Sequence, residues 1–275
     1  MVAISWLAEN LGDPNLVVVD GSYYLPAMKR DARAEYLAGH IPGAVFFDID
    51  EIADHTNKLP HMLPDAETFA RHMARLGIGE HMKIVVYDGG GLFSAPRVWW
   101  TLRLFGAKDV KLLDGGMPQW RAENRPVESG MVRRKPARFT PHFEASWVAD
   151  MAQVEKALGS AAQVVDARSA ERFRGEAPEP RPGVRLGRMP GSKNVPVAGV
   201  VENGRLASSE KIKAAFAAGG VDPDQPIITS CGSGVTAATL WLALDAIGKP
   251  PQALYDGSWT EWGSLPDKPL KTGAD

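Results

Sequence analysis

Short apolar runs alternate with amphipathic stretches along the chain. Four runs are rich in β-branched residues and end at a polar residue: 16–20, 83–88, 163–168 and 226–231. Between them, residues 65–77 and 208–220 carry apolar side chains at helical spacing, and the second stretch begins with Ser before Glu, as a helix cap does. This alternation predicts an α/β fold, with a central, mostly parallel sheet flanked by helices.

The same order of segments occurs twice. The first half contains "VVVDG", "AEYLAGHIPGAVFFD", "AETFARHMARLGI", "KIVVYDGGG" and "LLDGGMPQW"; the second contains "QVVDAR", "RLGRMPGSKNVPV", "SEKIKAAFAAGGV", "PIITSCGSG" and "LYDGSWTEW". Matching residues keep a nearly constant separation, 146 residues from Asp20 to Asp166 and 142 from Asp114 to Asp256. Five segments repeated in one order indicate a duplication.

The duplication predicts two similar domains. We expect them at residues 1–130 and 146–275, with a linker at 131–145 in a region rich in proline and charge that lacks sustained periodicity.

Composition restricts the partners. The chain has 275 residues, of which 44% are hydrophobic and 23% charged, and a formal net charge of −2, so it resembles a soluble globular protein without a basic surface for nucleic acid. No run approaches the ~18 apolar residues of a membrane helix, and the N-terminus has no signal-like pattern. We therefore expect a cytoplasmic protein that binds neither nucleic acid nor membrane. The eight tryptophans are expected to pack in the core rather than stack on bases.

Cys231 is the only cysteine, which excludes an internal disulfide and a cysteine-based zinc site. It lies in "TSCGSGVTA", between a predicted strand and a predicted helix. Gly232 and Gly234 allow the backbone to turn its amides towards the sulfur, and amides at a helix N-terminus favour a thiolate or persulfide anion. The aligned residue of the first repeat is Asp88, so only the second repeat carries a nucleophile.

Two other interpretations of this loop are open. Cys231 could be a small buried hydrophobic residue, which is what most single cysteines are. The glycines could instead cradle a phosphate, but the lysine of a Walker loop is absent and no dinucleotide fingerprint follows Cys231.

The loop "CGSGVT" and the alanine after it resemble the active-site loop of the 3-mercaptopyruvate sulfurtransferases, in the rhodanese superfamily. The resemblance extends over the chain through "GHIPGAVFFDID", "HMLP", "SAPRVWW", "LLDGGMPQW", "FRGEAPEPRPG" and "DGSWTEW". It implies two tandem rhodanese-like domains, of which only the C-terminal one is catalytic. It also implies that sulfur passes from 3-mercaptopyruvate through a Cys231 persulfide to a thiol such as that of thioredoxin, or to cyanide, without a metal or organic cofactor.

The resemblance also selects site residues. Arg172 and Arg181, in the arginine-rich segment 171–188, match the substrate-binding pair, and arginine suits a carboxylate beside a ketone. Without the resemblance, this segment would be interpreted as a solvated charged loop. Asp50 and His61 match residues that face the cysteine loop, although each would otherwise be interpreted as an ordinary loop residue.

Within the loop, Ser233 is expected to link to His61 and Asp50 and to relay a proton. The backbone amides that would stabilise the sulfur anion lie in the residues after the cysteine: Gly232, Ser233, Gly234, Val235 and Thr236.

Other activities remain alternatives. Members that prefer thiosulfate resemble "CRKGVT", with two cations where this chain has Gly232 and Ser233, so the loop favours mercaptopyruvate over thiosulfate. Phosphatases of a related fold need an arginine at the position of Ala237. A non-catalytic rhodanese-like binding module would lack the cysteine, as the first repeat does.

Overall fold

The computed structural model describes residues 1–274, which form two compact units. The first consists of Met1–His55, Leu63–Glu144 and Asn203–Arg205; the second consists of Thr56–Met62, Ala145–Glu202 and the chain from Leu206 on. Each unit therefore includes a short segment from the other half of the chain. The predicted linker, 131–145, has no helix or strand before Ala145, and its residues through Glu144 belong to the first unit.

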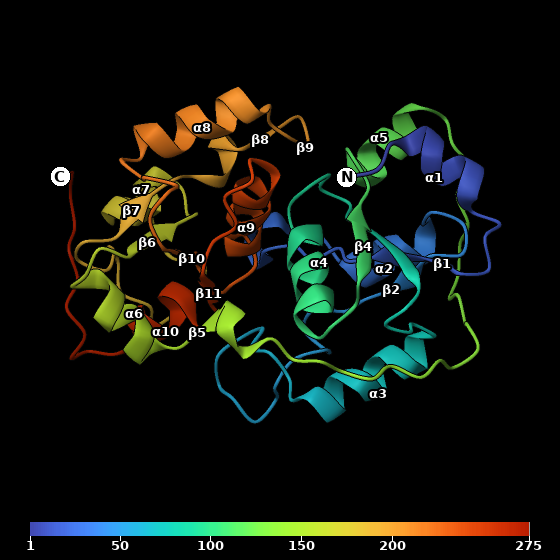
Figure 1. Ribbon diagram of the computed structural model, residues 1–275, viewed down its shortest axis with the longest axis horizontal. Helices are drawn as coiled ribbons and strands as arrows, with labels where there is room; N and C mark the ends of the chain where they lie inside the picture. The colour runs from blue at the N-terminus through green and yellow to red at the C-terminus, as the bar shows by residue number, and fades with distance from the viewer. Residues whose placement is uncertain (275) are drawn as a thin grey trace. The chain divides into compact units, whose positions relative to one another are not determined.

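The first unit is built on a parallel sheet flanked by helices (Figure 1). The sheet has four strands in the order β2-β1-β3-β4. Its strands are β1 (Leu16–Asp20), β2 (Val45–Phe46), β3 (Lys83–Tyr87) and β4 (Asp109–Leu112). Its helices are α1 (Ile4–Asn10), α2 (Ala32–Ala38), α3 (Ala66–Leu76), α4 (Ala95–Leu104) and α5 (Gly116–Ala122), with a 3-10 turn at Pro26–Met28.

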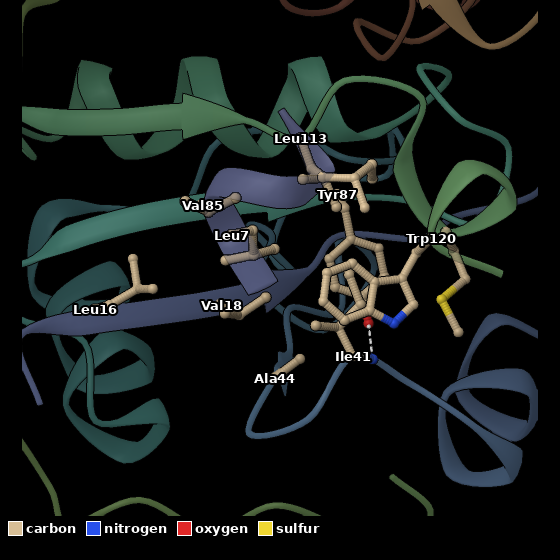
Figure 2. Packing of buried hydrophobic residues seen from close by; sticks show 11 residues of the cluster. Leu7, Leu16, Val18, Ile41, Ala44, Val85, Tyr87, Leu113 and Trp120 are labelled. Atoms are coloured by element: carbon tan, nitrogen blue, oxygen red, sulfur yellow. Dashed lines mark hydrogen bonds between the residues drawn. The ribbon is translucent and has the colours of Figure 1, made fainter. Parts of the chain in front are cut away.

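The core explains why the first four residues of β1 are apolar. Leu16 and Val18 pack on one face with Tyr87 of β3, Leu7 of α1 and Trp120 of α5, as Figure 2 shows. The alternate residues of β1 are buried as well, so both faces of the sheet are covered.

The second unit contains a parallel five-stranded sheet in the order β5-β11-β10-β6-β7. Its strands are β5 (Val148–Ala149), β6 (Gln163–Asp166), β7 (Lys193–Asn194), β10 (Ile227–Ser230) and β11 (Ala253–Tyr255), and a separate pair is formed by β8 (Val201–Glu202) and β9 (Arg205–Leu206). Its helices are α6 (Met151–Leu158), α7 (Ala170–Arg174), α8 (Ser209–Ala218), α9 (Ala237–Ala246) and α10 (Ser258–Ser264), with 3-10 turns at Ala145–Trp147 and Val197–Gly199.

The two sheets repeat one topology, because β2-β1-β3-β4 corresponds to β7-β6-β10-β11. Hydrogen bonds repeat as well: the amide of Met117 donates to Asp88 O over 3.0 Å, and that of Trp259 donates to Cys231 O over 3.0 Å. The predicted α/β class is confirmed, and the predicted strands and the two predicted helices lie within two residues of the observed ones.

The expected core role of tryptophan also agrees with the structure, in which five of the eight are less than 2% exposed: Trp100, Trp120, Trp241, Trp259 and Trp262. Within residues 1–274, no helix combines the length and the apolar character that crossing a membrane requires.

Asp20, at the end of β1, is a buried carboxyl that makes no ion pair with any other residue of the described chain. Burial raises the pKa of Asp20 to about 6. When a carboxyl has a higher pKa in the folded than in the unfolded protein, the free energy of unfolding falls as the pH rises through that interval. For Asp20 the fall extends from about pH 4 to about pH 6, and the loss persists at higher pH. We expect Asp20→Asn to stabilise the protein by about 3 kcal/mol near pH 8 and to have little effect near pH 4, measured by urea unfolding.

Asp13→Asn provides a control of opposite sign. The amide of Asn15 and the ammonium of Lys83 lower the pKa of Asp13, so this variant should be less stable than the wild type near pH 8. An Asp20→Asn effect of equal size at both pH values would contradict a raised pKa of Asp20.

Candidate active site

Cys231 directly follows β10, and the loop 231–236 connects it to α9. Its side chain is buried. Gly234 has φ +77°, in the left-handed region that glycine adopts without strain, so the loop turns sharply at this point. β10 is an inner strand of its parallel sheet, and Cys231 follows its last residue. Cys231 therefore lies at the carboxyl edge of the sheet, where α/β proteins bind ligands.

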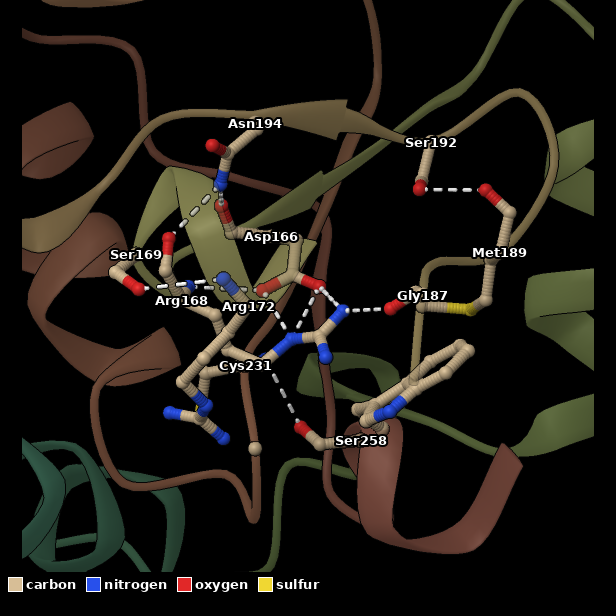
Figure 3. A network of polar contacts seen from close by, with 12 residues as sticks. Asp166, Arg168, Ser169, Arg172, Gly187, Met189, Ser192, Asn194, Cys231 and Ser258 are labelled. Carbon is tan, nitrogen blue, oxygen red and sulfur yellow. Dashed lines mark hydrogen bonds and ion pairs between the residues drawn. The ribbon is translucent and has the colours of Figure 1, made fainter. Parts of the chain in front are cut away.

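The hydroxyl of Ser258 fixes the cysteine loop. It accepts hydrogen bonds from the amides of Cys231 and Gly234, both at 3.1 Å, and donates to Tyr255 O at 2.8 Å; Figure 3 shows it beside Cys231. Ser258 has φ +51°, a conformation that is uncommon for a residue other than glycine. The hydroxyl of Thr260 donates to Gly232 O at 2.6 Å. The first residues of α10 therefore hold the loop by its amides and its carbonyl groups.

His61 and Ser233 lie within hydrogen-bond distance of each other. His61 Nδ1 lies 3.1 Å from Ser233 Oγ and 3.4 Å from Ser233 O, and both side chains are about 5% exposed. His61 also has a positive φ, +62°, and belongs to the segment Thr56–Met62 of the second unit. An imidazole within hydrogen-bond distance of a hydroxyl can exchange a proton with it.

The guanidinium of Arg172 lies next to the cysteine loop. A Cβ atom placed on Gly232 would come within 3.0 Å of Arg172 Nη2. Glu179 pairs with Arg172 at 2.5 Å, and its other oxygen pairs at 2.8 Å with Arg168. Arg168 in turn pairs with Asp166 at 2.8 Å, as Figure 3 shows.

This network is largely buried: Arg168 and Asp166 are fully covered, while Arg172 remains 20% exposed. Arg172 Nε is buried and has no hydrogen-bond partner. Unlike Arg168, whose Nε donates to Asp166, Arg172 therefore has one unused donor, and its Nη2 lies beside Gly232.

The first repeat shows what the equivalent loop can hold. The carboxylate of Asp88, aligned with Cys231, accepts four backbone hydrogen bonds of 2.7–2.8 Å from amides near the start of α4: those of Gly90, Phe93, Ser94 and Ala95. This loop thus holds an anion with its amides. The same kind of loop suits a sulfur anion at Cys231.

The remaining predicted residues lie in the cysteine loop, in the first unit and after α7. Gly232, Gly234, Val235 and Thr236 form the loop itself. Asp50 is exposed in the first unit, where its amide donates to Asp48 Oδ1 at 3.0 Å, and Arg181 lies partly buried in an irregular segment after α7. The roles of Asp50 and Arg181 stay predictions.

Sequence reasoning missed Ser258 and Glu179. A signal for Ser258 exists, because "DGG" at 114–116 becomes "DGS" at 256–258, so the hydroxyl occurs only in the repeat that carries the cysteine. Glu179 lies between Arg172 and Arg181 in an arginine-rich segment, where a carboxylate partner is to be expected.

A comparison with protein families identifies a rhodanese-like domain at residues 3–123 and again at 145–265. The 3-mercaptopyruvate sulfurtransferase of Escherichia coli O157:H7 is 46% identical over 275 residues, 98% of each chain. The thiosulfate sulfurtransferase of Cricetulus griseus is 42% identical over 271 residues, 95% of this chain and 91% of that protein.

Among solved structures, the crystal structure of SseA from Escherichia coli, described as a 3-mercaptopyruvate sulfotransferase, superimposes with a TM-score of 0.88. It is 44% identical, and the match covers 94% of this chain and 98% of SseA. Because these matches span both repeats and the chain retains a cysteine in the active-site loop, the chain belongs to the rhodanese family and is a sulfurtransferase with two rhodanese-like domains in tandem.

Proposed function

We propose that this sulfurtransferase takes the sulfur of 3-mercaptopyruvate, holds it as a persulfide on Cys231 and passes it to a thiol. The observation that carries the proposal is the loop itself: a buried thiol at the N-terminal side of α9, with Gly232 and Ser233 in place of two cations, beside Arg172, whose Nε has no hydrogen-bond partner.

In the first step, the Cys231 thiolate attacks the thiol sulfur of the donor. A sulfur–sulfur bond forms and the carbon–sulfur bond breaks, which leaves a Cys231 persulfide and the enolate of pyruvate. Arg172 would bind the donor's carboxylate, with Arg181 as the second cation. The amides of the loop would stabilise the negative charge on sulfur.

The enolate must then gain a proton to become pyruvate. Ser233 and His61 form a pair that can deliver one, because the hydroxyl can donate towards the substrate while the imidazole reprotonates it. Asp50 would orient His61 in this relay. Apart from sulfur and this proton, no group is exchanged, so the reaction requires neither a metal nor an organic cofactor.

In the second step, a thiolate attacks the outer sulfur of the persulfide and regenerates the Cys231 thiolate. A reduced thiol such as that of thioredoxin fits this step, and cyanide would replace it in an assay. We place this chemistry in the cytoplasm, because a reducing compartment maintains both a free thiol on the enzyme and a reduced acceptor.

Thiosulfate is the alternative donor, and a relative of this length carries that activity in its name. The local charge favours mercaptopyruvate, because Glu179 offsets the charge of Arg172, and the loop adds no cation for a dianion. We expect kcat/KM for mercaptopyruvate to exceed that for thiosulfate by at least about tenfold, with cyanide as the acceptor in both assays. A preference for thiosulfate would overturn the proposed donor and leave the persulfide intact.

A further inference from the structure

The first unit contains a cavity of about 360 Å³ that the sulfur-transfer chemistry does not use. It lies at the carboxyl ends of β1 and β3, and all its lining residues belong to the first unit. Gly89, in its wall, follows Asp88 as Gly232 follows Cys231. The cavity is therefore beside the point of the first repeat that corresponds to the cysteine loop of the second.

Four charged residues line the cavity, and two of them, Arg30 and Glu35, form an ion pair with each other. Arg30 pairs with Glu35 at 2.5 Å, and its Nε donates to the same carboxylate at 2.8 Å. Tyr24 donates to Glu35 at 2.9 Å and accepts from Arg30 at 2.6 Å. The guanidinium of Arg30 also lies over the Tyr24 ring, 3.7 Å from its centroid. These three residues are hydrogen-bonded to one another; the hydrogen bond from Arg30 lowers the pKa of Glu35 most, and the charge of Arg121 lowers it further.

Asp20, which is buried, and Arg121, which is exposed, form no ion pair with another residue of the described chain. Asp20 accepts hydrogen bonds from the amide of Ser22 at 3.0 Å and from its hydroxyl at 2.5 Å, and both of these donors are neutral. Arg121 Nη2 donates to Gly39 O at 3.0 Å. Across residues 1–274, neither charge has an ion-pair partner, although both line the same cavity.

The corresponding aspartate of the second repeat does form an ion pair, so the two repeats differ at this position. Asp166, which corresponds to Asp20, is paired with Arg168. The first repeat has Ser22 two positions after its aspartate, where the second has the arginine. Asp20 is thus a buried carboxyl without the arginine that pairs with the corresponding aspartate of the second repeat. Burial raises the pKa of Asp20, and such groups lower stability and occur preferentially at functional sites.

Two glycines leave no room for side chains in this wall. A Cβ on Gly89 would come within 2.1 Å of the Tyr24 hydroxyl, and one on Gly39 within 3.2 Å of Arg121 Nη2. The volume of the cavity is at the lower end of the range of about 300–1,000 Å³ for small-molecule sites. The occupant must therefore be small, and it must complement one anion and one cation.

We propose that the first unit binds a free amino acid in this cavity, with the ammonium group on Asp20 and the carboxylate on Arg121. A zwitterion of this kind supplies a cation for the buried Asp20 and an anion for the exposed Arg121, and it would place a cation where the second repeat has Arg168. This site is independent of the donor and acceptor used at Cys231.

The test uses full-length Cys231→Ser protein, so that no probe can react at the catalytic sulfur. Each of the proteinogenic amino acids is titrated singly by calorimetry near pH 8. For every amino acid that binds, the matching amine without the carboxylate and the matching acid without the ammonium are titrated as well. We expect at least one amino acid to bind and both of its analogues to bind at least about tenfold more weakly. The proposal fails if no amino acid binds, or if either analogue binds as tightly.

Two variants locate the site. Asp20→Asn and Arg121→Gln should each weaken binding at least about tenfold, whereas Asp13→Asn and Arg125→Gln, which remove charges outside the cavity wall, should leave it unchanged. Because Asp20→Asn is expected to raise stability near pH 8, a loss of binding in this variant cannot come from unfolding. Wild-type affinity in either cavity variant would overturn the assignment.

Discussion

The Cys231→Ser protein should lose sulfur transfer by at least about ten-thousandfold, because a hydroxyl cannot form the persulfide that carries the sulfur. The wild-type protein mixed with mercaptopyruvate should gain one sulfur atom on the peptide that contains Cys231, and the variant should gain none. Intact and peptide mass spectrometry measure the modification, and pyruvate release measures the rate.

Folding is the control for this variant. Serine is close to cysteine in size, and the residue's amide and carbonyl group keep their bonds to Ser258 and Trp259, so the midpoint of urea unfolding should change little. Activity within tenfold of the wild type would exclude a persulfide on Cys231. A wild-type protein that never acquires sulfur would instead support a non-catalytic binding module.

The second large effect is expected at Arg172. Replacement by glutamine should lower kcat/KM for mercaptopyruvate about 100-fold, because a charge-assisted pair with the substrate carboxylate is lost. Most of the change should appear in KM if Arg172 binds the donor equally in the ground state and the transition state. Steady-state pyruvate release over a range of donor concentrations separates the two constants.

Arg174→Gln is the matched control, because Arg174 lies on the same helix but pairs with Glu176 at the surface, at 2.7 Å. Its kcat/KM should stay within about twofold of the wild type. Arg172→Gln also leaves Glu179 with only Arg168, so unfolding must be measured alongside activity. Equal losses in both arginine variants, or a loss explained by unfolding, would place Arg172 among structural residues.

The main strands and helices could be predicted because short stretches of sequence specify them. The apolar runs define β1, β3, β6 and β10, and Asp65 and Gly77 mark the two ends of α3: Asp65 accepts from the amide of Thr68, and Gly77 adopts φ +68°. β2 and β7 were not predicted, since two-residue edge strands carry almost no periodic signal.

The site was predictable only in part. Cys231 is marked by its own loop, and family resemblance selected His61, whose contact with Ser233 is present. Ser258 and Glu179 could not be assigned in this way, because their importance depends on partners 27 and 7 residues away that only folding brings close. The cavity around Asp20 has the same origin: its charges come from separate elements, and no single segment reveals that two of them lack partners.

The segment Thr56–Met62 belongs to the second unit although it lies in the first half of the chain, and this limits how the two repeats can evolve. The catalytic unit is discontinuous in the gene, since it draws His61 from the half of the chain that lacks the cysteine. A gene truncated to the second repeat would encode the nucleophile without its imidazole. Loss of the copy without the cysteine would therefore be selected against, and the two halves are expected to be inherited together rather than shuffled as independent modules.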